Sequence, residues 1–156
     1  MKPFFAIIFA AALCTGAGAQ DLGLKEFTLG AEMSTCPGNT VKQTVTGLRL
    51  MCKLNATTLA NQDVLDVTIS IYDGRLIGAF FNLGVGGQYS HPEVLAALQE
   101  KFGKPSRAKP HLNQYSWDRG QKSLGFDGWK GHVILVDFEA EKQLRSKEAS
   151  TNKADL

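Results

Sequence analysis

Residues 64–83, VLDVTISIYDGRLIGAFFNL, predict a β-hairpin, and this hairpin constrains the fold more than any other segment of the chain. Two runs of β-branched and aromatic residues flank the dipeptide Asp73-Gly74. A two-residue Asp-Gly loop adopts the primed turn that joins antiparallel strands. The chain is therefore expected to be built on an antiparallel sheet.

A regular register across this turn sorts the side chains of the hairpin into two faces, because cross-strand partners share a face. The first face is expected to consist of Val67, Ile69, Ile71, Leu76 and Phe80. The strand at residues 75–83 is also apolar on its second face, where Phe81 lies. Either other parts of the fold cover that second face, or it is a hydrophobic patch for a partner. The sequence leaves both interpretations open.

An amphipathic helix is predicted after the glycine-rich link at residues 84–87. Ser90 and Glu93 have the spacing of a capping box, and Gly103 is expected to end the helix before Pro105. The buried stripe of this helix is expected to consist of Val94, Leu95, Leu98 and Phe102.

Three more strands are predicted in the C-terminal part of the chain. Tyr115 and Trp117 alternate with polar residues in the first, residues 118–120 and 127–128 form turns, and residues 132–138 read as a central strand because nearly every position is apolar. The predicted fold class is α+β: an antiparallel sheet with one main helix packed on a face, as a two-layer sandwich, and a short C-terminal helix.

The N-terminal residues 1–19 have the features of a secretory signal peptide. Lys2 precedes a short apolar run, and small residues lead to a predicted cleavage site between Ala19 and Gln20. The expected organisation is a signal peptide at 1–19, one α+β domain at 20–145 and a solvated tail at 146–156. The expected location is periplasmic or secreted, with no transmembrane segment in the mature chain.

The mature chain would contain two cysteines, Cys36 and Cys52, and we predict that they form a structural disulfide. They enclose 15 residues, and closing such a loop stabilises a fold by roughly 3 kcal/mol in the chain-entropy model. A redox centre would normally have the spacing CxxC, and a zinc site would need about four ligands. Alternation around Leu50 and Leu54 points Cys52 toward the core.

The charge balance argues against a nucleic-acid partner. Loss of Lys2 with the signal peptide leaves 16 basic side chains against 15 acidic ones, which gives no global positive field. One basic loop at residues 101–111 stands out. Its candidates for contact with an anionic lipid or polysaccharide surface are Lys101, Lys104, Arg107 and Lys109.

No catalytic motif is found in the sequence. Ser123 lacks the GxSxG arrangement of a nucleophile elbow, and residues 84–87 do not fit a phosphate-binding loop. We therefore predict no catalytic residues, no metal site and no cofactor.

The segments LKEFTLG and LQEKFGKPS, together with the tryptophan strand and the meander after it, resemble small exported modules of the outer-membrane-assembly lipoprotein and β-lactamase-inhibitor type. The chain departs from them because it lacks the lipidation cysteine and has its own disulfide spacing. The resemblance implies a protein-binding role without catalysis.

The predicted function is a non-catalytic periplasmic or secreted module that binds another envelope or secreted protein. Aromatic side chains dominate many interfaces, and the candidates are Phe81, Tyr89, Tyr115, Trp117 and Trp129. One alternative is an envelope-associated protein that binds anionic surfaces through the basic loop. Another is a hydrolase with an unrecognised site. The sequence leaves the oligomeric state open.

Overall fold

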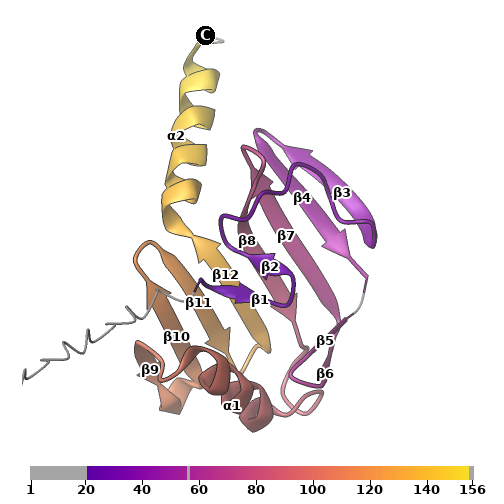
Figure 1. The fold of residues 1–156 in the computed structure, drawn as a ribbon, viewed down its shortest axis with the longest axis vertical. Helices are drawn as coiled ribbons and strands as arrows, with labels where there is room; N and C mark the ends of the chain where they lie inside the picture. The colour runs from indigo at the N-terminus through magenta and orange to yellow at the C-terminus, as the bar shows by residue number, and fades with distance from the viewer. Residues whose placement is uncertain (1–20, 56, 155–156) are drawn as a thin grey trace, which may run out of the picture.

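The computed structural model describes residues 21–55 and 57–154 (Figure 1). The predicted signal peptide lies outside the described residues. Within the described residues the strands are β1 (Gly23–Leu24), β2 (Phe27–Thr28), β3 (Thr40–Thr46), β4 (Arg49–Leu54), β5 (Thr57–Leu59), β6 (Gln62–Val64), β7 (Asp66–Tyr72), β8 (Arg75–Asn82), β9 (Arg107–Lys109), β10 (Gln114–Arg119), β11 (Lys122–Asp127) and β12 (His132–Asp137). The helices are α1 (His91–Phe102) and α2 (Phe138–Ala154), and a 3₁₀ turn occupies Pro110–Leu112.

One antiparallel sheet forms the body of the molecule. Its strand order is β3-β4-β7-β8-β12-β11-β10-β9, and β1-β2 and β5-β6 form two small separate hairpins. The large sheet thus consists of two meanders that meet where β8 pairs with β12. This arrangement confirms the predicted α+β class and the central position of the strand at 132–137.

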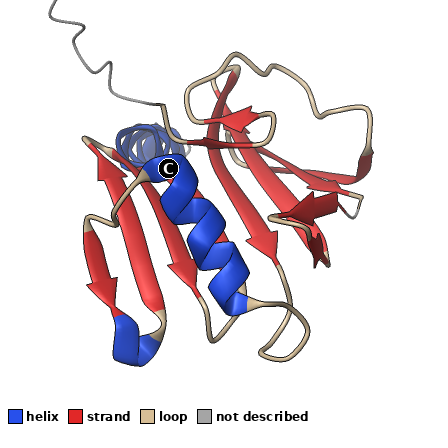
Figure 2. Ribbon diagram, turned by 60° about the horizontal axis from the view of Figure 1, so that its bottom comes forward, coloured by secondary structure: helices blue, strands red, loops and turns tan. Residues whose placement is uncertain are grey.

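We call the sheet face that carries α1 the covered face (Figure 2). The ring of Phe102 on α1 lies 6.4 Å from that of Trp117 on β10, and the ring of His91 stacks on Phe126 of β11 at 5.2 Å. The β1-β2 hairpin covers β8, where Phe27 meets Phe81 at 6.1 Å. The main hydrophobic core therefore lies between the sheet and these elements.

The C-terminal helix α2 begins on the opposite face, which we call the open face. Leu144 is fully buried against Tyr72 and Ile77, with Ala140 beside them. Beyond this contact α2 extends past the end of the sheet (Figure 1). The chain is helical to Ala154, so most of the segment expected to be a solvated tail continues the helix.

The predicted register of the central hairpin is wrong after its first residues. The turn itself is confirmed, because Asp73 and Gly74 have φ angles of 51° and 68°, as a primed turn requires. A β-bulge then places Ile77 as an extra residue between the pairs Ile71–Leu76 and Ser70–Gly78.

The bulge exchanges the two faces of β8 for the rest of the strand. Val67 therefore lies opposite Phe81 in the core, whereas a regular register would place Phe80 there. Phe80 instead points to the open face. The extra residue, Ile77, is itself buried against α2, which gives the bulge a packing role.

The start of α1 also differs from the prediction. Ser90 is the N-cap residue, but its side chain makes no capping hydrogen bond. Gln62 on β6 replaces the capping box: its Oε1 accepts from the backbone amide of Ser90 at 2.8 Å, and its Nε2 donates to Glu93 at 2.6 Å. The helix ends before Gly103, as predicted, with a φ of 77° at that glycine.

Candidate functional site

The open face has an apolar centre. Side chains alternate along β12, so that Val133 and Leu135 are buried in the core and Ile134 and Val136 point the other way. Ile134 is 41% exposed. It lies between Gly125 of β11 and Phe80 of β8.

The next row of the open face also has an aliphatic side chain of β12 at its centre. Val136 lies between Ser123 of β11 and Gly78 of β8, and Ser70 and Met51 continue the row across β7 and β4. Met51, Phe80 and Val136 are half-buried. A sheet face in contact with water normally carries polar side chains, so this apolar strip is an exception.

The strip lies in a trough. A hollow of about 390 Å³ is lined by the apolar side chains of Met51, Phe80, Ile134 and Val136 together with Thr68, Ser70 and Gly78, and by Glu141 of α2. A second hollow, of about 800 Å³, also contains Val136 and Glu141 and continues along α2 past Phe138, which is 52% exposed. The two hollows share Val136 and Glu141, and we call them together the trough: it lies over β4, β7, β8 and β12 and continues along α2, which forms a wall.

Two glycines lie on the open face beside β12: Gly78 lines the first hollow, and Gly125 lies on the other side of β12, next to Ile134. No heavy atom lies within 4 Å of the position that a Cβ atom would take at Gly125. A Cβ atom at Gly78 would lie 3.2 Å from the carbonyl oxygen of Leu135. A glycine inside a strand often marks a place where another molecule approaches the backbone closely, and Gly125 has room for such an approach.

The acidic and the basic groups of the open face differ in whether they have partners. Its carboxylates have partners: Glu141 accepts from Arg49 at 2.6 Å and Asp118 from Arg107 at 3.1 Å. Asp66 accepts from Asn82 at 3.2 Å, and Asp127 from Gln114 at 3.1 Å. Three exposed cations at the lateral edges of this face have no ion-pair partner among the described residues: Lys42, Lys53 and Lys109.

The pKa of Asp118 lies below its ordinary value. The main cause is the hydrogen bond from Ser123 Oγ, at 2.7 Å, which outweighs the opposing effect of burial, and Arg107 adds to it. Ser123 is buried and donates to this carboxylate, so the structure does not present its hydroxyl as a nucleophile.

The pKa of Asp127 is also lowered. Burial is the largest single influence and raises it, but hydrogen bonds from the Lys130 amide, the Gln114 side chain and the Trp129 amide together exceed that effect. These bonds fix the turn between β11 and β12, so Asp127 serves local structure.

The five aromatic candidates do not form one exposed cluster. Phe81 and Trp117 are fully buried, and Trp117 Nε1 donates to the carbonyl of Gly103 at 2.8 Å. Tyr89 is buried, donates to the carbonyl of Gly128, and has a pKa raised by burial and by Asp127. Tyr115 is half-buried against the core. Trp129 alone among the five is exposed, at 65%.

The four basic candidates do not all lie on one face of the molecule. Arg107 and Lys109 on β9 share the open face with Ser116 and Gln114. Lys101 lies on α1, with its ammonium 5.3 Å from the centre of the Phe102 ring, and therefore belongs to the covered face. Lys104 is exposed between them. Binding of an anionic surface through all four cations stays a prediction.

The segment around Arg107 was expected to be a loop, but it forms the short edge strand β9. Arg107 and Lys109 are exposed there. Charged side chains on a short edge strand hinder pairing with other chains, which gives these two residues a structural role.

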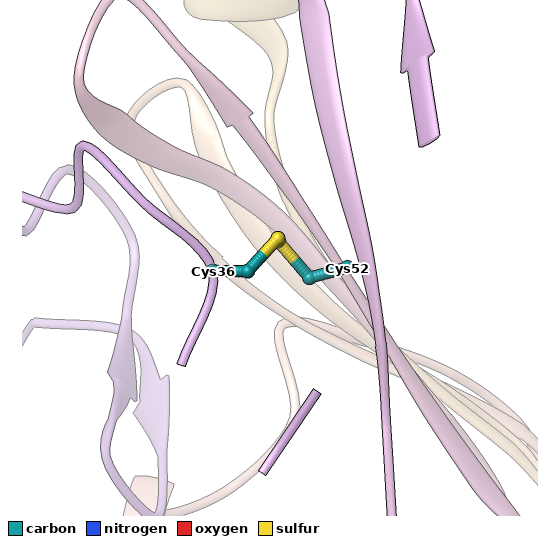
Figure 3. The surroundings of a disulfide bond; sticks show 2 residues. All are labelled: Cys36 and Cys52. Carbon is teal, nitrogen blue, oxygen red and sulfur yellow. A yellow bond between two sulfur atoms is a disulfide. The ribbon is translucent and has the colours of Figure 1, made fainter. Parts of the chain in front are cut away.

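The predicted disulfide is confirmed. Cys36 and Cys52 are bonded, with a Cα–Cα distance of 5.6 Å (Figure 3). Cys52 is fully buried on β4, and Cys36 lies on the preceding loop. The bond attaches this loop to the covered face of the sheet.

Comparison with known proteins assigns the chain to no family. No protein-family model, curated protein or solved structure matches the chain. Over residues 21–55 and 57–154, no group of three or more histidine, cysteine or carboxylate side chains is placed to hold a metal ion. The same residues contain no helix with the length and hydropathy needed to cross a membrane.

Proposed function

We propose that the chain is an exported, non-catalytic protein-binding module, stapled by one disulfide, and that the trough on the open face is its binding surface. One observation carries the proposal: Phe80, Ile134 and Val136 lie side by side on a sheet face that the described residues leave largely uncovered. An apolar strip at the centre of a polar surface is typical of a contact with another protein.

The position of the strip in the fold supports this proposal. The strip lies on β8 and β12, which are central strands with neighbours on both sides. Their opposite face is anchored in the core by Phe81, Val133 and Leu135. A surface held this rigidly loses little conformational entropy on binding.

The resemblance to exported inhibitor and assembly modules implies the same role. The resemblance consists only of short sequence segments. The proposal therefore rests on the trough, and the resemblance is consistent with it.

Site-specific photo-crosslinking in the exporting cells tests the proposal. A photoreactive residue at position 134 is expected to give a discrete protein adduct, whose yield falls when Phe80→Lys is added. The matched control places the same residue at position 85, because Val85 is also an exposed aliphatic side chain, at 63%, but lies in a loop. Equal adduct patterns from both positions would contradict the proposal.

A further inference from the structure

We infer that the trough binds an amphipathic helix of a partner protein, and that acidic side chains border the apolar stripe of this helix. The inference rests on the proposed function and specifies the partner's chemistry. Three features carry it: the shape of the trough, the placement of two glycines beside β12 and the charges along the edges of the open face.

The dimensions of the trough fit a helix. Its floor includes Ile134 and Val136 of β12, and its second hollow continues along α2 from Glu141 to Ala149. Together these segments extend for about 20 Å at the usual rises of a strand and a helix. A helix of about 13 residues has the same length. On the covered face α1 already packs in this way, with Val94, Leu98 and Phe102 against the sheet.

The glycines allow a helix to approach the sheet. Gly125 and Gly78 lie diagonally on either side of β12, next to Ile134 and Val136 respectively. Each glycine leaves a depression beside an aliphatic side chain. Apolar side chains spaced three or four residues apart on a helix can fill such depressions.

The edges of the open face are basic. Lys42 and Lys53 are cross-strand neighbours at one lateral edge, and Lys109 lies at the other. Among the carboxylates of the face, Glu141 and Asp118 are neutralised by Arg49 and Arg107, and Asp66 and Asp127 are held by hydrogen bonds from the neutral amides of Asn82 and Gln114. The electrostatic complement of an apolar strip between unpaired lysines is an apolar stripe between carboxylates.

The same charges argue against a second copy of this chain as the occupant. If two open faces packed together about a two-fold axis parallel to the strands, Lys42 and Lys53 would face Lys109. An axis perpendicular to the strands would place each basic edge against itself. Both arrangements bring like charges together, which costs free energy.

The trough also favours a helix over a lipid surface. Its apolar side chains lie on a floor beside α2, and Glu141 of α2 lines both of its hollows. A flat bilayer would meet α2 before the floor. A helix is narrow enough to enter.

Two synthetic peptides of about 14 residues provide the test. Both carry the same leucine stripe; one has glutamate along both borders of the stripe and the other has lysine. Their binding to the mature protein is measured by fluorescence anisotropy at low and at physiological salt. The glutamate peptide is expected to bind at least about tenfold more tightly than the lysine peptide, with a difference that shrinks as salt rises.

Two variants connect the binding to the trough. Gly125→Val fills the depression beside Ile134 and is expected to weaken binding of the glutamate peptide at least about tenfold. The double variant Lys53→Glu/Lys109→Glu reverses the edges and is expected to reverse the preference between the two peptides. Loss of binding without reversal would contradict the electrostatic part of the inference.

The remaining outcomes separate this inference from the proposed function. If both peptides bind equally and Gly125→Val abolishes the binding of both, the inference that acidic side chains border the partner helix is wrong. The proposed protein-binding function would still stand. Binding of neither peptide would overturn the inference, while the crosslink from position 134 tests the proposed function by itself.

Vesicles of phosphatidylcholine and phosphatidylglycerol form the last arm of the experiment. If they bind and Gly125→Val weakens their binding as much as it weakens peptide binding, the occupant is lipid and the inference is wrong.

Discussion

Gly125 lies directly opposite Ile134 in the β11-β12 pair, and a side chain at Gly125 would meet no other atom within 4 Å at its Cβ position. Gly125→Val is therefore expected to raise the free energy of unfolding by about 1 kcal/mol, because glycine is a poor strand residue and valine a good one. Urea denaturation measures the change. The matched variant Gly78→Val should lower stability, since its Cβ would press on the carbonyl of Leu135. Destabilisation by both variants would contradict the free space at Gly125.

Reduction of the Cys36–Cys52 disulfide is expected to cost roughly 3 kcal/mol of stability, because it releases a loop of 15 residues. Urea denaturation with and without a reductant measures this loss, and the double variant Cys36→Ser/Cys52→Ser serves as the control that a reductant should not change. The native protein should have no titratable thiol among residues 20–156. A free thiol in the folded mature chain would contradict the bond.

The parts of the fold that the sequence predicted correctly depend on neighbouring residues. The turn at Asp73-Gly74, the end of α1 at Gly103 and the inward direction of Cys52 follow from φ requirements or from alternation over a few positions. These local signals established the α+β class because the elements they mark occur in an order that few folds allow.

The bulge at Ile77 was not predictable in this way. The bulged residue Ile77 packs together with Tyr72 against Leu144, a residue of α2 far away in the chain. One extra residue then exchanged Phe80 and Phe81 between the core and the open face. Apolar residues on both faces of a strand carry no mark of which face meets water.

The candidate site could not be predicted from the sequence for the same reason. Phe80 and Ile134 become neighbours only when β8 pairs with β12, and no local pattern encodes that pairing. The run around Ile134 was predicted to be a central strand because it is almost wholly apolar, and that pattern does not indicate which of its faces meets water. The aromatic candidates were chosen by residue type, and packing placed Phe81 and Trp117 in the core.

Leu144→Ala is expected to detach α2 from the sheet. Leu144 is fully buried against Tyr72 and Ile77, and truncation of a buried leucine typically costs about 2 to 5 kcal/mol. Amide hydrogen exchange should therefore rise throughout residues 138–151 while the strands keep their protection. Lys142→Ala is the matched control, because Lys142 is exposed on the same helix. Equal exchange in both variants would contradict a docked helix.

The two tryptophans are expected to behave differently on replacement. Trp117 is fully buried and hydrogen-bonded to Gly103, so Trp117→Ala should cost about 3 to 5 kcal/mol. Trp129 is 65% exposed, and Trp129→Ala should change stability by no more than about 0.5 kcal/mol. Thermal unfolding followed by circular dichroism measures both effects. Equal losses would contradict the burial of Trp117.

Acid is expected to weaken the fold through Asp118. Its pKa is lowered in the folded protein, mainly by Ser123 and then by Arg107 against the effect of burial. The ionised form is therefore favoured by folding, and this stabilisation is present above the unfolded pKa of about 3.9. It is lost as the pH falls through the lower pKa of the folded state.

Asp118→Asn should accordingly reduce stability at pH 7 and make a much smaller difference at a pH below the folded pKa of Asp118. Ser123→Ala should raise the pKa of Asp118 toward its ordinary value, which an NMR titration of the carboxyl group can follow. The exposed Asp63 provides the control: Asp63→Asn is expected to alter stability little at either pH. A loss in Asp118→Asn that is equally large in strong acid would show that packing, rather than the carboxylate charge, stabilises this corner of the sheet.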